Sequence, residues 1–194
     1  ENALQAEDLL SQVREGEPSD ALVFQVAALR ERAKPNADEK AAAADRLRFF
    51  EESLAAHPYL DQIRAQLAAA DIKAGDRQKA LDRWTLPLSE KQVRTASLFG
   101  AASTHALLGE ADKAGALLRR VGENHDPTVD ELLMGARMTA ALGRADDAKA
   151  LVSQAAAIKT GRGTSTAAVA GAFLELEDAA KAESLAQQAV QITD

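Results

Sequence analysis

Three histidines are the first side chains in this sequence that could bind a metal ion or move a proton near neutral pH. His57 and His125 lie next to prolines, in the strings AHPY and NHDP, which predicts loop positions between helices. His105 lies in an apolar helical stretch, where it is interpreted as a core residue with one hydrogen bond. No histidine has a convincing helical metal-ligand partner, and cysteine is absent. The sequence therefore predicts no metal site.

The other patterns that could carry catalysis are weaker still. The string Lys159–Thr166 is glycine-rich, but it lacks the spacing of a phosphate-binding loop and follows a helical stretch rather than a strand. Paired carboxylates such as Glu51/Glu52 and Asp146/Asp147 are typical of a solvated helix face, and Ser153 and Ser184 lack a triad context. We therefore expect no catalytic residues, no cofactor and no enzyme activity.

Composition excludes several classes of partner. The 194 residues are 46% hydrophobic and 27% charged, with a formal net charge of −7. An acidic chain is a poor ligand for nucleic acid or for an anionic membrane surface. No apolar run reaches the roughly 20 residues of a membrane span, and no signal peptide is evident. The first residue is Glu1 rather than Met, so we expect a fragment of a longer protein.

The elements that would position these residues are all helical. Alanine, the best helix former, dominates, while Gly, Pro and strand-length β-branched runs are scarce. Whether the stretch 34–44 is helix or loop is open, with helix favoured because 38–48 is unbroken. The expected helices are 3–15, 20–33, 38–56, 60–74, 77–86, 90–108, 111–122, 129–142, 145–159, 165–176 and 179–193.

An internal repeat of 34 residues organises the second half of the chain. Each copy has a glycine that would end one helix in the left-handed conformation, then a small alanine at a helix contact, then a large apolar residue. A fourth copy carries Glu177 in the glycine position. The matched columns are Gly75, Gly109 and Gly143; Ala80, Ala114 and Ala148; and Trp84, Leu118 and Val152.

Local signals mark where the repeats begin and end. Ser89–Gln92 and Thr128–Glu131 have the capping-box pattern that starts a helix. Pro87 and Pro127 are expected in the breaks between repeats. Trp84 is expected in the core, and of Phe49 and Phe50 at least one should be buried.

These columns resemble the tetratricopeptide repeat (TPR) family, whose 34-residue units each form two antiparallel helices. The resemblance covers nearly the whole chain, although the aromatic columns of the family are mostly Leu, Val or Ala here. It implies an all-α fold, an α-solenoid that winds as a right-handed superhelix, in one array over 1–194. The expected repeats are 1–18 (partial), 19–60 with an insertion, 61–94, 95–128, 129–162 and 163–194.

The resemblance also implies a site. In this family the first helix of each repeat lines a concave groove that holds a peptide or partner segment. Phe99 and Leu133 are expected as apolar anchors, and the carboxylate clamp of co-chaperones is not expected because the cations are too few. Leu107 and Leu174 could equally pack against neighbouring helices. The candidate groove residues are Gln62, Lys73, Phe99, Ser103, Leu133 and Arg137.

We therefore expect a non-catalytic scaffold for protein–protein interaction. Similar bacterial arrays form periplasmic parts of exopolysaccharide secretion proteins beside an outer-membrane pore, which predicts a periplasmic location and a role in biofilm formation. The alternatives are a cytoplasmic adaptor or chaperone, a regulatory domain of a longer enzyme, and a carbohydrate-binding groove. The last is disfavoured by an aromatic content of only 4%.

Overall fold

The computed structural model describes residues 2–34, 38–124, 126–159 and 161–192, and within these residues all regular structure is helical. The chain forms two compact units, Glu1–Thr85 and Leu86–Asp194, which are described separately. Whether one array runs through both units stays a prediction. The helices are α1 (Asn2–Glu15), α2 (Asp20–Arg32), α3 (Glu39–Ala56), α4 (Asp61–Lys73), α5 (Arg77–Asp82), α6 (Thr85–Ser89), α7 (Thr95–Leu107), α8 (Ala111–Glu123), α9 (Val129–Ala141), α10 (Ala145–Ala157), α11 (Gly163–Glu175) and α12 (Ala179–Gln191).

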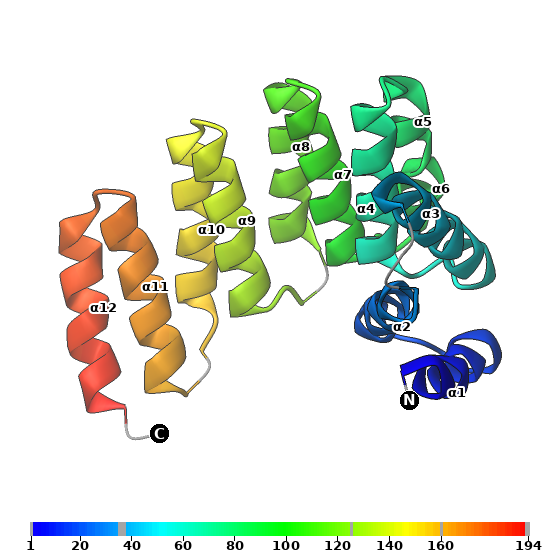
Figure 1. Ribbon diagram of the computed structural model, residues 1–194. Coiled ribbons are helices and arrows are strands. Elements are labelled where there is room, and N and C mark those ends of the chain that lie inside the picture. Colours follow the sequence, from blue (N-terminus) through cyan, green and yellow to red (C-terminus); the bar gives the residue numbers. More distant parts are fainter. Residues whose placement is uncertain (1, 35–37, 125, 160, 193–194) are drawn as a thin grey trace. The chain divides into compact units, whose positions relative to one another are not determined.

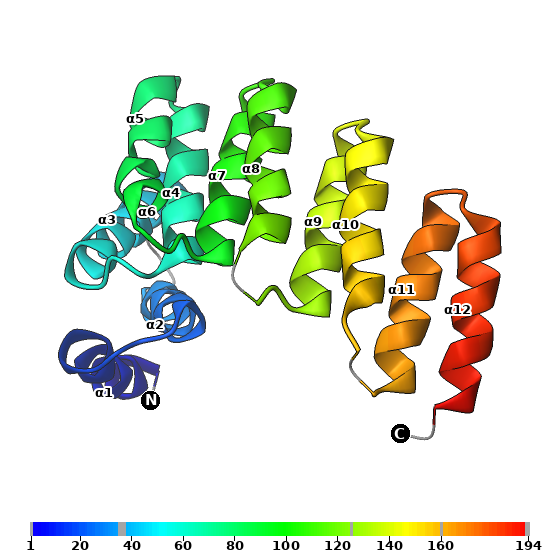
Figure 2. The same cartoon turned by 180° about the vertical axis from the view of Figure 1, so that it is seen from behind.

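The second unit is an α-solenoid of three TPR-like hairpins, α7–α8, α9–α10 and α11–α12, which follow one another as a row of helix pairs (Figures 1 and 2). Their first helices begin at Thr95, Val129 and Gly163, so the 34-residue period of the sequence is the period of the helices. Gly109 and Gly143 have positive φ values of 76° and 75°, which confirms their predicted role in ending the first helix of a hairpin.

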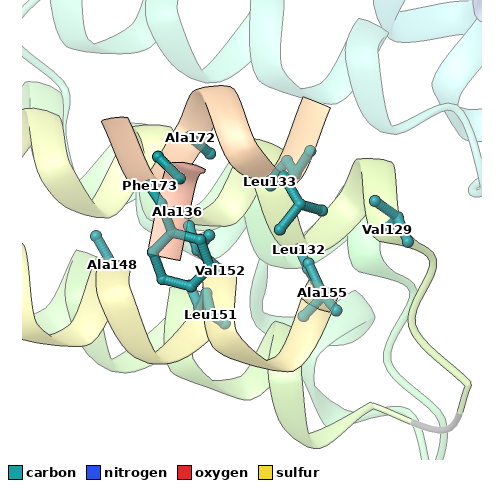
Figure 3. Close-up of a cluster of buried hydrophobic side chains, with 12 residues drawn as sticks. Val129, Leu132, Leu133, Ala136, Ala148, Leu151, Val152, Ala155, Ala172 and Phe173 are labelled. Atoms are coloured by element: carbon teal, nitrogen blue, oxygen red, sulfur yellow. The ribbon is translucent and has the colours of Figure 1, made fainter. Parts of the chain in front are cut away.

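The core of this unit lies where one hairpin packs on the next. Figure 3 shows Phe173 of α11 beside Ala136 of α9 and beside Ala148 and Val152 of α10, and all four side chains belong to one buried cluster. The small alanine lets the two helices of a hairpin approach, and the large residue fills the space that results. Small-into-large packing in the predicted columns is therefore what joins the hairpins.

The first unit contains α1 to α5 around a core of its own. Phe49 and Phe50 of α3 are both buried, at 5% and 3% exposure, although the sequence required only one of them to be. The imidazole of His57, at the end of α3, donates from Nε2 to the carbonyl of Val13 at 2.7 Å and so joins α1 to α3. Trp84 is 2% exposed, as predicted for a core residue.

The insertion before α3 is partly helical. α3 begins at Glu39 behind an Asp38 cap and runs for 18 residues, so the favoured helical interpretation is confirmed from Glu39 onward. Residues 35–37 lie outside the described part of the chain, as does His125.

One expected helix was wrong near Pro87. The expected helix 77–86 is divided into α5 and α6, and Pro87 lies buried inside α6 rather than in a break. Proline has no N–H to bond the carbonyl of Arg83, four residues earlier, and that carbonyl accepts instead from Arg64 Nη1 at 3.0 Å. Pro87 therefore leaves the Arg83 carbonyl without the backbone bond that a continuous helix would make, and α5 ends at Asp82, just before it.

The predicted capping box at Ser89–Gln92 was also wrong. The hydroxyl of Ser89 donates to the carbonyl of Leu86, at the end of α6, and α7 starts only at Thr95. The side chain of Asn124 donates to the Val93 carbonyl and to the Thr95 hydroxyl, which gives the extended segment before α7 a tertiary anchor that no local pattern encodes.

The capping box at Thr128 is confirmed in full. The Thr128 hydroxyl accepts from the Glu131 N–H at 3.2 Å, and the Glu131 carboxylate accepts from the Thr128 N–H at 2.9 Å. Among the described residues, no helix combines the length and the apolar content that crossing a bilayer would require.

Candidate functional site

The predicted groove residues fall in both compact units. Gln62 and Lys73 lie on α4 in the first unit, and both side chains are exposed. The other four lie on first helices of the second unit: Phe99 and Ser103 on α7, and Leu133 and Arg137 on α9. A surface that includes Lys73 and Arg137 would need both units, whereas the four residues on α7 and α9 belong to the second unit alone.

The two expected apolar anchors contribute to packing. Leu133 is only 4% exposed and belongs to the buried cluster of α9, α10 and α11, which leaves little of it for a partner to contact. Phe99 is half-buried, and a Cβ added to Gly135 of α9 would lie 3.7 Å from Phe99 Cε1. Both side chains therefore contribute to the stacking of neighbouring hairpins, and their expected role as apolar anchors for a partner stays a prediction.

Two other side chains on the same helices are apolar and exposed. Leu107 of α7 is 64% exposed, and Met134 of α9 is 49% exposed. Leu107 is residue 13 of its 34-residue repeat, and Met134 is residue 6 of the next repeat. Positions seven residues apart lie on the same side of a helix, so these two side chains lie on equivalent sides of α7 and α9. Arg137, one turn after Met134, is exposed as well. Helical periodicity marks these positions as facing one way, but Met134 was not among the predicted residues.

The charged side chains of the first unit form a network that fixes α3 to α4 and α5. The guanidinium of Arg83 donates to the Asp71 carboxylate and, at 2.6 Å, to Glu51, while Lys79 approaches Asp71 at 3.0 Å. Burial opposes the ionisation of Asp71, but the hydrogen bonds from Arg83 and Lys79 outweigh it and hold the pKa of Asp71 below its ordinary value. The hydrogen bond from Arg83 likewise lowers the pKa of Glu51.

A second set of charges joins hairpins of the second unit. Arg144, which precedes α10, contacts Asp147 at 2.7 Å and Asp112 of α8 at 2.8 Å, and Arg119 of α8 contacts Asp147 at 3.1 Å. The hydrogen bond from Arg144 holds the pKa of Asp147 below its ordinary value. The predicted solvated carboxylate of Asp147 is thus a bridge between neighbouring hairpins.

The remaining histidine, His105, has a local partner. Its Nδ1–H donates to the carboxylate of Glu110 at 2.6 Å, across the turn between α7 and α8, and its side chain is 17% exposed. This agrees with the interpretation of His105 as a packed residue with one hydrogen bond, and the bond lowers the pKa of Glu110. Within the described residues, no group of three His, Asp or Glu side chains could hold a metal ion.

Aromatic side chains offer little surface to a sugar ring. Trp84, Phe49, Phe50 and Phe173 are buried, and Tyr59 in the first unit is 40% exposed. A sugar face stacks on an exposed aromatic ring. Phe24 and Phe99 are half-buried, so Tyr59 is the most exposed of the described aromatic rings, and the carbohydrate-binding groove stays an untested alternative.

Sequence comparisons find no relative of this chain, since neither a model of a known protein family nor a curated protein matches it. Solved structures do resemble its fold. MamA is 15% identical with a TM-score of 0.47, covering 84% of this chain and 91% of its own. A thermophilic TPR protein from Thermus thermophilus is 16% identical with a TM-score of 0.47, covering 90% and 91%.

A third solved structure is YrrB, described as a TPR protein with an unusual peptide-binding site. It is 14% identical with a TM-score of 0.43, covering 97% of this chain and 93% of its own. All three TM-scores are below 0.5. The 34-residue helical period, the left-handed glycines and the small-into-large core make the second unit an all-α solenoid of TPR-like helix–turn–helix repeats.

Proposed function

We propose that this chain is a non-catalytic scaffold that binds a protein partner along the first helices of the second unit. The observation that supports the proposal is the exposure of two large apolar side chains, Leu107 of α7 and Met134 of α9, on first helices of neighbouring hairpins. Large apolar side chains are costly to leave in water, and clusters of them on a monomer surface are typical of interaction sites.

The surroundings of these residues suggest the chemistry of the partner segment. Arg137 is exposed one turn from Met134, and Ser103 is half-buried one turn before Leu107. Methionine and arginine are both enriched in protein interfaces. We therefore propose a partner segment with apolar side chains for Leu107 and Met134 and an acidic group for Arg137.

The chemistry of the polar groups supports a non-catalytic role. The hydroxyl of Ser153 donates to the Lys149 carbonyl within its own helix, and the carboxylates of Asp71 and Asp147 are held by arginines in structural bridges. General acid–base catalysis needs a group whose pKa lies near the working pH, whereas these carboxylates have lowered pKa values.

The test is capture of partners from an extract of the source cells, followed by mass spectrometry. A Leu107→Glu/Met134→Glu variant places two charges in the proposed surface and should fold normally because both side chains are already exposed. Leu86→Glu is the matched control, since Leu86 is 66% exposed on α6. We expect partners that the wild type and the control both bind and the double variant does not.

A second variant tests the charge of the partner. Arg137→Glu should weaken the same partners at least tenfold, and an acidic-to-basic change in the bound segment should restore binding. Partners that bind equally well to the double variant and to the wild type would refute the proposed surface. The Phe99→Glu/Leu133→Glu pair is a poor test because it would charge the packing between hairpins.

The cellular setting is a separate proposal. Alanine-rich composition and the TPR resemblance favour a periplasmic scaffold in exopolysaccharide export, and a cytoplasmic adaptor is the alternative. Fractionation of the source cells with an antibody against this chain would decide between them. Recovery with periplasmic markers is the expected result, and recovery with cytoplasmic markers would exclude the export role.

A further inference from the structure

Both sulfur atoms of this chain lie on α9, and one of them belongs to the surface proposed for the partner segment. The chain contains two methionines and no cysteine, and the methionines are Met134 and Met138. Met134 is 49% exposed, whereas Met138, one turn later, is half-buried. Peroxides oxidise thioether sulfur, and the susceptibility of a methionine follows its exposure. Met134 is therefore the side chain of this pair that is more open to oxidation.

The packing of α9 keeps such a reaction away from the core. The residues through which α9 joins the buried cluster of the second unit are Val129, Leu132, Leu133 and Ala136, and none of them contains sulfur. An oxygen atom added to the exposed side chain of Met134 stays in contact with water, so it leaves no polar group buried. Oxidation at Met134 therefore changes the chemistry of the surface and leaves the fold intact.

One added oxygen changes two parts of the proposed surface at once. The sulfoxide of Met134 is a polar acceptor, and an apolar side chain of the partner could cover it only by removing it from water. Arg137 is exposed and lies three residues later, where side chains on a helix are neighbours. Its guanidinium can donate to the sulfoxide oxygen, which then competes with the acidic group of the partner segment.

We propose that Met134 is a redox-controlled position at which hydrogen peroxide forms methionine sulfoxide and so releases the partner segment. A lone pair of the sulfur attacks one peroxide oxygen, the O–O bond breaks, and the other oxygen leaves as water after a proton transfer. The sulfur loses two electrons and the peroxide gains them. A methionine sulfoxide reductase reverses the step with electrons from a dithiol. This inference rests on the proposed function, because it concerns regulation of the same surface.

The first test measures where hydrogen peroxide reacts in purified residues 1–194. Trypsin cleaves after arginine, so it separates Met134, in peptide 121–137, from Met138, in peptide 138–144. Mass spectrometry then follows the gain of one oxygen atom in each peptide over time. In the folded chain we expect Met134 to react about twofold faster or more, and in urea we expect equal rates. Equal rates in the folded chain would overturn the proposal.

The second test asks whether the oxidised chain keeps its fold. In the Met138→Leu variant, Met134 contains the only sulfur atom, so peroxide modifies one known site. We expect the same circular dichroism spectrum and the same Tm before and after oxidation, because the Met134 side chain is already half in water. A lower Tm after oxidation of this variant would mean that the reaction damages the fold, and it would overturn the proposal.

The third test measures binding. The probe is the protein that the wild type captures from the cell extract and that Leu107→Glu/Met134→Glu does not capture. Peroxide should weaken its binding to the wild type about tenfold, and a methionine sulfoxide reductase should restore it. Met134→Leu should bind it equally well before and after peroxide. Met134→Gln, whose amide oxygen resembles the sulfoxide oxygen, should bind it weakly without peroxide.

The outcomes separate this proposal from the proposed function. Unchanged binding by the oxidised wild type would overturn the redox proposal and leave the partner surface in place. Loss of binding by oxidised Met134→Leu would assign the effect to another residue, which would overturn the redox proposal as well. Partners that Leu107→Glu/Met134→Glu retains would refute the proposed function itself, and the redox proposal would be refuted with it.

Discussion

Glu177 occupies the position that Gly143 holds one repeat earlier, and it adopts the same left-handed backbone, with φ of 61° against 75° for the glycine. Both residues end the first helix of a hairpin, and the carbonyls of that helix bond to the turn in the same way, Thr139 to Arg144 and Phe173 to Asp178. The geometry of the turn is thus retained where the favourable residue is lost, because the packing of α12 on α11 requires it.

This strain predicts a stabilising substitution. A left-handed conformation costs a non-glycine residue about 1–2 kcal/mol, and glycine avoids most of that cost. Glu177→Gly should raise the free energy of unfolding by about 1 kcal/mol in thermal or urea denaturation. The control is Glu175→Gly, which places glycine in the last residue of α11 and should be neutral or destabilising. Equal effects of the two changes would contradict the explanation.

Larger residues in the alanine column are expected to destabilise the protein. Ala114 and Ala148 are both 0% exposed and lie where the two helices of a hairpin meet. Ala148→Leu should lower the free energy of unfolding by about 1–3 kcal/mol, because three more carbon atoms must enter a filled core. Ala145→Leu, at an exposed position three residues earlier, should change it by less than about 0.5 kcal/mol. A tolerated leucine at position 148 would show that the helices do not meet there.

Removing the capping box of α9 is expected to lower the stability of the protein and to loosen the first turn of that helix. Thr128→Ala removes the hydroxyl that accepts from the Glu131 N–H and should cost about 1 kcal/mol of unfolding free energy. Thr128→Ser keeps the hydroxyl and is the matched control. Amide hydrogen exchange at the first turn of α9 should rise in the alanine variant alone, and unchanged protection would count against the cap.

The ion pairs of Arg83 with Asp71 and Glu51 are expected to make the free energy of unfolding depend on pH. Asp71 and Glu51 have folded-state pKa values below their unfolded values of about 3.9 and 4.3. The stability they contribute is therefore fully present above the unfolded pKa values and is lost as the pH falls through the lower folded values. Arg83→Gln should cost about 2 kcal/mol at pH 7, less than a fully buried pair because Glu51 is half-exposed.

The difference between wild type and Arg83→Gln should then shrink below about pH 4.5, as measured by urea denaturation from pH 7 to pH 3. Lys73→Gln, which removes an exposed cation from the same unit, should show a small difference that does not change with pH. A constant difference for Arg83→Gln would mean that the arginine acts through its packing rather than through the two carboxylates.

Local rules were sufficient to predict most helices of this protein. Alanine content, the left-handed glycines and the Thr128 cap are preferences of the nearby backbone, and the 34-residue columns report contacts that recur in every hairpin. The same rules failed near Pro87 and Ser89, where the Arg83 carbonyl and the segment before α7 take side-chain partners distant in the sequence.

The amino-acid sequence by itself determined that the chain is helical, that its units repeat every 34 residues and which small and large residues meet. Only the tertiary structure decided which residues of a first helix are available to a partner. Periodicity assigns a side chain to one side of a helix, but burial depends on what the next hairpin places there. Leu133 is therefore covered by α11, while Met134, its neighbour in the chain, is left exposed.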